Sequence, residues 1–234
     1  MIYQLIYGTT IIKYQLTFSN RKSLGVKVHP DKSVHVIAPI GTEMLKINEK
    51  LKTKASWILK QQAFFLSFYP LTPERKFVSG ETHLYLGKQY RLKLIEGDME
   101  SVKMKSGYLF ITLKEISNTA RIEFLLRSWY AKKAVFHFES LFKKNLKIAT
   151  SISDIIPSLK YRWMDKRWGS CDAKGIIHLN LELIKSPKVC IEYVLLHEIC
   201  HLRYLDHGNA FVQLLNTLCP DWKLTKDRLE KMMV

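Results

Sequence analysis

The chain has 234 residues, of which 47% are hydrophobic and 25% are charged, a balance typical of an ordinary globular protein. This balance argues against a mainly disordered chain, and ten glycines, seven prolines and four cysteines argue against a collagen-like or disulfide-stapled chain. Lys and Arg number 37 against 21 Asp and Glu, which gives a formal net charge of +16. This charge is compatible with nucleic acid or another anionic partner, although a basic solvated surface is the more ordinary explanation.

The positive charge is spread over both halves of the chain, since residues 1–118 carry 18 basic and 9 acidic side chains and residues 119–234 carry 19 and 12. No stretch approaches the roughly 20 consecutive apolar residues that a membrane span needs, so we expect no membrane partner. The four cysteines show neither a disulfide pattern nor a CxxC pair. We therefore expect reduced thiols in a cytoplasmic protein.

In chain order, residues 2–39 are rich in β-forming residues, and Pro39 and Gly41 break this pattern. Apolar residues at helical spacing then predict a helix from about Thr42 to about Phe68. Short apolar runs separated by glycines predict further strands. These lie at residues 77–79, 83–86, 90–94, 102–104 and 108–113. No internal sequence repeat is evident.

A long helix is predicted from about Asn118 to about Ala149. Its seven basic and two acidic side chains make residues 118–149 the best candidate for a surface that faces nucleic acid or phosphate, although the solvated face of an amphipathic helix has the same composition. Strands near residues 160–163 and 176–179 follow, and the rest is predicted to be helical. The predicted fold class is α+β, with a β-rich N-terminal region at 1–117 that contains one long helix, and a second region at 118–234. The boundary is soft, and a single core shared by both regions is an alternative.

The residues that carry chemistry lie between Tyr193 and His207, where the sequence contains His-Glu-x-x-His. The preceding residues are apolar enough for a buried helix, which is the context that this motif requires. On a helix, His197 and His201 occupy positions i and i+4 of one face and can bind one cation together. Glu198 follows the first ligand, where it can reach a metal-bound water without binding the metal itself.

A third ligand is expected after the helix. His207 lies six residues after His201, the interval found in the metzincin pattern His-Glu-x-x-His-x-x-Gly-x-x-His. The glycine of that pattern is Tyr204 here, so the turn that presents His207 must differ from the metzincin turn. The alternatives for the third position are carboxylates, namely Asp206, Asp221 and Glu230.

Further motifs on both sides of the histidines follow one family pattern in order. In the C-terminal part they are Arg167-Trp168-Gly169-Ser170-Cys171, Gly175, Leu179-Asn180, Pro187, Tyr193-Val194, Phe211 and Pro220-Asp221-Trp222. In the N-terminal part they are Arg21-Lys22-Ser23, Ala38-Pro39, Trp57-Ile58, Gly80-Glu81 and Leu86-Gly87. Through these motifs nearly the whole chain resembles the YgjP-like metallopeptidase family, a group of small zincins related to the SprT-like and WLM proteases.

The resemblance implies that residues 118–234 form a zincin-like α+β part that carries the His-Glu-x-x-His helix. It also implies one Zn²⁺ per chain, with His197, His201 and His207 as ligands and Glu198 as the general base. The implied activity is that of a zinc metallopeptidase, which uses a zinc-bound water activated by Glu198. A peptide or an unfolded protein would then be the substrate.

Two other functions stay open. Members of the family are also described as nucleotide pyrophosphatases, so a metal-dependent phosphohydrolase acting on nucleoside triphosphates is an alternative, although the sequence lacks the loop G-x-x-x-x-G-K-[ST]. The second alternative is a nucleic-acid-associated binding module with a structural zinc. A structural site would more often have four protein ligands, and Glu198 would have no role in it.

Several further residues are candidates for contact with substrate, namely Arg167, Trp168, Tyr193 and Tyr204. Trp168 would wall the cleft, and the other three are candidates for oxyanion stabilisation. The segment around Trp168 is predicted either as a hairpin packed on the core or as an edge strand that pairs with an extended peptide. Cys171 and Cys200 are either buried inert thiols or metal-proximal thiols that act as inhibitory ligands or redox switches.

Overall fold

The structure, a computed structural model, describes residues 2–29, 31–66 and 75–232. The fold class is α+β, as predicted, and the chain divides into two compact units, Met1–Thr72 and Pro73–Met233. This division lies earlier in the chain than the boundary expected near residue 117. The reason is that the strands between residues 82 and 113 share a hydrophobic core with the C-terminal helices, whereas the N-terminal strands have a core of their own.

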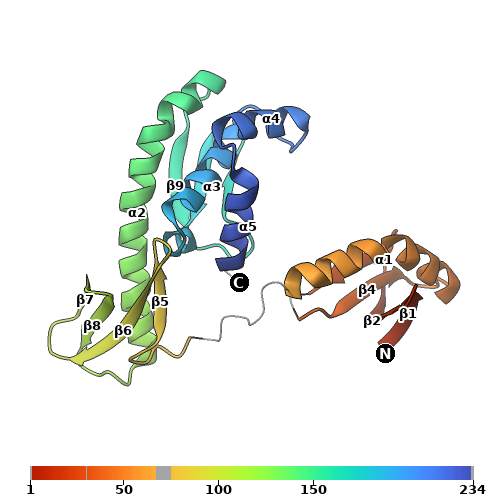
Figure 1. The fold of residues 1–234 in the computed structure, drawn as a ribbon, viewed down its shortest axis with the longest axis horizontal. Helices are drawn as coiled ribbons and strands as arrows, with labels where there is room; N and C mark the ends of the chain where they lie inside the picture. The colour runs from red at the N-terminus through yellow and green to blue at the C-terminus, as the bar shows by residue number, and fades with distance from the viewer. Residues whose placement is uncertain (1, 30, 67–74, 233–234) are drawn as a thin grey trace. The chain divides into compact units, whose positions relative to one another are not determined.

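The first unit is a four-stranded sheet packed against one helix (Figure 1). Its strands, in the order β1-β2-β4-β3, are β1 (Ile2–Tyr7), β2 (Thr10–Ser19), β3 (Gly25–Val28) and β4 (Val34–Pro39). Alternate residues of β2 and β4 are buried, and helix α1 (Met44–Leu66) covers them with Ile47, Leu51, Ala55 and Ile58. Phe68, the predicted end of this helix, lies outside the described residues.

The second unit begins with another four-stranded sheet, in the order β5-β6-β8-β7, and the long helix α2 (Thr119–Ile152). The strands are β5 (Thr82–Tyr85), β6 (Lys88–Glu96), β7 (Ser101–Lys105) and β8 (Tyr108–Leu113). The strand predicted at 77–79 does not form. Phe77 has a φ of 54°, and the backbone amides of Lys76 and Phe77 donate to the Glu81 carboxylate at 2.9 and 2.7 Å, so these groups close a turn instead of joining a ladder.

Strands β1–β4 with α1 and strands β5–β8 with α2 have the same topology. In each set the first two strands form an antiparallel hairpin with a two-residue turn, after Tyr7 and after Tyr85. The second and fourth strands are parallel, the third is antiparallel to the fourth, and the helix follows. The architecture therefore contains a repeat that the sequence does not show. The strand pairing is the same in both sets, whereas the side chains and loop lengths differ.

The rest of the described second unit consists of a small sheet, a 3-10 helix and three α-helices. The strands β9 (Ser158–Arg162), β10 (Gly169–Cys171) and β11 (Ile176–Asn180) lie in the order β10-β11-β9, which makes β10 an edge strand. A 3-10 helix, η1 (Leu181–Lys185), leads to α3 (Lys188–Cys200), α4 (Asn209–Leu218) and α5 (Trp222–Met232). Helix α3 contacts both α2 and α5 (Figure 1). No described helix is long and apolar enough to cross a membrane.

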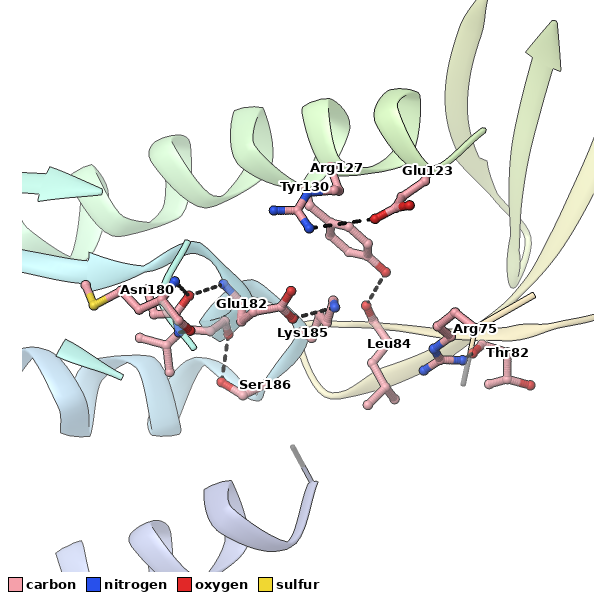
Figure 2. Close-up of polar contacts among 12 residues, drawn as sticks. Arg75, Thr82, Leu84, Glu123, Arg127, Tyr130, Asn180, Glu182, Lys185 and Ser186 are labelled. Atoms are coloured by element: carbon pink, nitrogen blue, oxygen red, sulfur yellow. Dashed lines mark hydrogen bonds and ion pairs between the residues drawn. The ribbon is translucent and has the colours of Figure 1, made fainter. Parts of the chain in front are cut away.

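Polar contacts hold the β5–β6 hairpin and η1 against α2, as Figure 2 shows in part. The Tyr130 hydroxyl of α2 donates to the Leu84 carbonyl of β5 at 2.7 Å. The backbone amides of Leu86 and Gly87 donate to carbonyls of η1 at 2.9 and 3.0 Å. A Cβ on Gly87 would lie 2.7 Å from the ring of Pro187, so the hairpin turn abuts the start of α3. These contacts position the helix that carries the histidine motif.

Candidate metal centre

Helix α3 places two histidines of the motif side by side. Nine of its thirteen residues are buried, because the helix is surrounded by α2, α4, α5, η1 and the small sheet. The rings of His197 and His201 have centroids 5.0 Å apart. His201 follows the last helical residue but keeps helical dihedral angles, with φ −70° and ψ −13°. The i, i+4 relationship therefore extends to it.

His207 reaches the same place from the turn between α3 and α4. Its ring centroid lies 5.0 Å from that of His197 and 4.7 Å from that of His201. The Nε2 atoms of His207 and His197 are 3.1 Å apart, and one ligand nitrogen from each of the three histidines lies within 4.8 Å of the others. Among the described residues, this cluster contains no carboxylate. The alternatives that the sequence left open therefore lie outside it, namely Asp206, Asp221 and Glu230.

The hydrogen bonding and charge of the imidazoles fit a metal ion. Nδ1 of His201 lies 2.9 Å from the backbone carbonyl of Tyr204, and because a carbonyl only accepts, Nδ1 carries the proton and Nε2 keeps its lone pair. Burial lowers the pKa of His197 to about 4, and the charges of the neighbouring imidazoles make a smaller contribution in the same direction. Burial also lowers the pKa of His201. Three imidazole ligands suit Zn²⁺ and leave a fourth position open.

Aromatic residues restrict the orientation of the three imidazoles. Phe211 of α4 is only 2% exposed, and its ring lies 5.0, 4.7 and 4.7 Å from those of His197, His201 and His207. Tyr193 contacts the His197 ring edge-on at 6.1 Å. The sequence marked Phe211 only as part of the family resemblance. His207 precedes the start of α4, so no helical spacing links it to Phe211, and only the packing of α4 reveals this contact.

Glu198 is 5% exposed and lines a pocket of about 190 Å³ together with His197, which we call the Glu198 pocket. Burial raises the pKa of Glu198 to about 7, while the Arg167 charge and the backbone amide of Cys171 act in the opposite direction. Its Oε2 atom is buried and has no hydrogen-bond partner among the described residues. A carboxylate with this pKa can accept and release a proton near neutral pH.

The edge strand β10 approaches the Glu198 carboxylate closely at a glycine. A Cβ on Gly169 would lie 2.7 Å from Oε1 of Glu198 and 2.9 Å from its Cγ. Gly169 pairs with Leu179 of β11, so the strand cannot move away without losing its ladder. A side chain at position 169 would therefore have to displace the Glu198 side chain. Gly169 belongs to the motif at residues 167–171, but the sequence predicted no role for it.

The structure brings three of the four predicted substrate-contact residues to the site. Trp168 and Tyr193 line the Glu198 pocket. Arg167 lines an adjacent hollow of about 480 Å³ that shares Trp168 with that pocket. Tyr204 contributes its backbone carbonyl to His201, and its ring contacts the Arg203 guanidinium instead.

Two other groups at the site were not predicted as substrate contacts. Lys226 and Glu230 of α5 line the Glu198 pocket and form an ion pair, with Nζ and Oε1 3.9 Å apart.

The loop before β10 is held by Asn180, whose side-chain amide donates to the backbone carbonyls of Met164 and Arg167 at 2.8 and 3.0 Å. The side-chain oxygen Oδ1 of Asn180 accepts a hydrogen bond from the backbone amide of Glu182 at the start of η1 (Figure 2).

The cysteines near Glu198 are protonated thiols. Burial, with a contribution from the Glu198 charge, raises the pKa of Cys171 to about 11 and that of Cys200 to about 12. All four cysteines are free, and neither Cys171 nor Cys200 belongs to the described metal cluster. Of the two predicted alternatives, the structure favours the inert thiol.

A family model described as "YgjP-like, metallopeptidase domain" matches residues 22–232 of the chain. The matched range includes the three clustered histidines and Glu198, and it extends over most of the first compact unit as well as the second. A comparison with curated proteins found no match.

Proposed function

The chain belongs to the YgjP-like metallopeptidase family, and from this premise we propose that it is a zinc-dependent hydrolase that cleaves peptide bonds with Glu198 as its general base. The observation that carries this proposal is the position of Glu198. Its buried carboxylate, with a pKa near 7, lines the same pocket as His197. A general base needs both this reach and this pKa.

His197, His201 and His207 would hold the ion, since their nitrogens lie within 4.8 Å of one another. When bound, zinc lowers the pKa of a water molecule toward neutrality and polarises the scissile carbonyl. Glu198 accepts the proton of the attacking water and returns it to the leaving amine. Phe211 and Tyr193 keep the imidazoles oriented.

We infer that the substrate is an extended polypeptide segment. Strand β10 is the edge of its sheet and passes directly beside Glu198, so its free edge can pair with an extended backbone near the reacting carbonyl. Trp168 supplies an apolar wall for a substrate side chain. Lys226 lines the pocket and the Arg167 charge acts on Glu198, so these two cations are the candidates for oxyanion stabilisation.

Hydrolysis of nucleoside triphosphates is the second candidate, and three cations favour it, since Lys166, Arg167 and Lys226 line the two hollows. Besides Glu198, three carboxylates line the same surfaces, namely Asp165, Glu182 and Glu230. These carboxylates would repel a triphosphate, whereas a polypeptide tolerates mixed charge. A binding module with a structural zinc is disfavoured, because the described cluster offers three ligands rather than four.

The test is a paired assay on zinc-loaded protein with measured metal content. Wild type and Glu198→Gln are assayed against denatured protein substrates and against nucleoside triphosphates, with Glu49→Gln, an exposed acid-to-amide change in α1, as the matched control. We expect Glu198→Gln to keep its zinc and to lose peptide cleavage by about 10²- to 10⁴-fold. Glu198-dependent pyrophosphate release without peptide cleavage would select the second candidate. Equal activity in both proteins would contradict a catalytic role for Glu198.

A further inference from the structure

The solvent face of α1 in the first unit combines lysines with an exposed tryptophan. The helix contains five lysines and one glutamate. Its apolar side, centred on Ile47, Leu51 and Ile58, is buried against the sheet. Trp57 points away from this core and is 44% exposed, although indole is a side chain that is usually well buried.

Four of the lysines lie along one side of the helix around Trp57. Lys46, Lys50 and Lys54 recur every four residues, and Trp57 and Lys60 follow at intervals of three, so the five side chains are neighbours on the helix surface. We call them the α1 basic stripe. The stripe is roughly 21 Å long, because an α-helix rises about 1.5 Å per residue. All four lysines are exposed.

The charges of the stripe are largely uncompensated. Among the described residues, Lys46 is paired with Glu43 at 3.4 Å, and Lys50, Lys54 and Lys60 form no ion pair. Two exposed carboxylates, Glu43 and Glu49, lie in this helix or directly before it in the sequence. Asp31 lines a hollow beside the C-terminal residues Leu59 and Gln62 of this helix. An uncompensated row of ammonium groups is suited to a polyanion, which releases counterions when it binds.

The long helix α2, the candidate that the sequence favoured, is different. Three of its seven basic side chains are engaged by carboxylates, since Arg121, Arg127 and Lys144 form ion pairs with Glu100, Glu123 and Glu192. Arg127 also lies over the Trp163 ring at 4.4 Å, and Lys133 lies over Trp129 at 5.8 Å. Much of the positive charge on α2 is therefore used within the fold.

The charge is also concentrated in the unit that carries the stripe. Residues 1–72 contain ten basic and three acidic side chains, so this unit holds a net charge of about +7 in less than a third of the chain. A division at residue 118 conceals this concentration, because residues 73–118 add six acidic and eight basic side chains and so contribute a net charge of only +2.

We propose that the α1 basic stripe binds single-stranded nucleic acid. The lysines contact successive phosphates, and the Trp57 indole stacks on an unpaired base, the combination by which single strands are bound without sequence preference. A duplex offers the phosphates but no free base face, so it should bind more weakly. The proposal does not rest on the hydrolase activity, and Glu198→Gln should leave this binding unchanged.

The experiment measures fluorescence anisotropy of a labelled oligothymidylate of about 16 nucleotides with the full chain, over a range of salt concentrations. Lys50→Gln with Lys54→Gln should reduce the slope of log affinity against log salt by about 1.4, since each lost phosphate contact removes about 0.7 for a single strand. Trp57→Ala should weaken binding by about 5- to 150-fold, and Trp57→Phe should restore most of it. These side chains are exposed, so the variants should fold, which circular dichroism verifies.

The matched control changes two exposed lysines of α2, Lys143→Gln with Lys147→Gln, and should leave both affinity and salt slope nearly unchanged. Several results would overturn the proposal. A loss in the α2 pair equal to that in the α1 pair would show a diffuse charge effect, and unchanged affinity in Trp57→Ala would exclude stacking. Binding to vesicles rich in phosphatidylserine without binding to the oligonucleotide would assign the stripe to an anionic membrane surface instead.

Discussion

Gly169 and Glu198 form the closest fit at the candidate metal centre, since a Cβ on Gly169 would lie 2.7 Å from the carboxylate oxygen Oε1. The two residues are far apart in the sequence and belong to an edge strand and a buried helix. The hydrogen-bonded ladder of β10 with β11 and the packing of α3 against α2 and α5 leave neither element free to retreat. Glycine at position 169 therefore determines where the carboxylate of residue 198 can lie.

Gly169→Ala should displace the Glu198 carboxylate and lower turnover by about tenfold or more, because displacements of about 1 Å in a reacting group can cost up to 10²-fold. Zinc content should stay at one ion per chain, since the atoms nearest to a Cβ at position 169 all belong to Glu198, which is not a ligand. The measurement is turnover per bound zinc. Ser170→Ala, on the neighbouring residue of β10, is the control and should retain activity. Loss of zinc together with activity in Gly169→Ala would contradict this account.

Phe211→Leu should weaken zinc binding by removing the aromatic surface against which the three imidazoles pack. Outer contacts that orient metal ligands typically contribute about 10- to 100-fold to metal affinity. Competition with a chromophoric chelator measures this affinity. Leu215→Ala, a buried change in the same helix, is the control, because it should destabilise the fold by about 2–5 kcal/mol with zinc affinity retained. An equal loss of zinc affinity in both variants would mean that lower fold stability, and not the contact of Phe211 with the imidazoles, weakens zinc binding.

Glu198→Gln should change how stability depends on pH in the zinc-free protein. Burial raises the folded-state pKa of Glu198 from 4.5 to about 7, so between these values the folded protein retains a proton that the unfolded chain has lost. This carboxyl therefore makes stability fall as pH rises through that window. His197, with its pKa lowered from 6.5 to about 4, has the opposite effect over a similar range.

The glutamine variant removes only the Glu198 contribution. Its stability relative to wild type should therefore increase steadily from pH 4.5 to about pH 7 and stay constant above it. Urea unfolding at a series of pH values in the presence of a chelator gives this difference directly. A constant difference across the range would mean that Glu198 titrates normally in the folded state.

Cys171 and Cys200 should react slowly with iodoacetamide at pH 8, since their pKa values of about 11 and 12 leave almost no thiolate. Mass spectrometry of labelled peptides with and without urea measures the protection. Unfolding should restore ordinary reactivity at both positions. Rapid labelling of Cys171 in the folded protein would instead support the metal-proximal, redox-active alternative.

Local sequence patterns predicted most of the elements. Alternation and glycine spacing located the strands from residue 82 to residue 113, and Asn118 caps α2 through its side chain, which accepts the Arg121 amide at 3.0 Å. The strand expected at residues 77–79 failed because the Glu81 carboxylate captures two backbone amides there. The compact units divide earlier than the boundary predicted near residue 117, because strand content does not indicate which core a strand joins.

The sequence by itself determined the pairing of His197 with His201 and the place of Glu198 beside them, because an i, i+4 spacing on a helix has one geometric outcome. Only the tertiary structure brought His207, Phe211 and Gly169 to the same centre, and only it separated a strongly basic first unit from the second. The physical reason is the range of the interactions. Helical periodicity acts over a few residues, whereas these contacts depend on packing between elements that are distant in the chain.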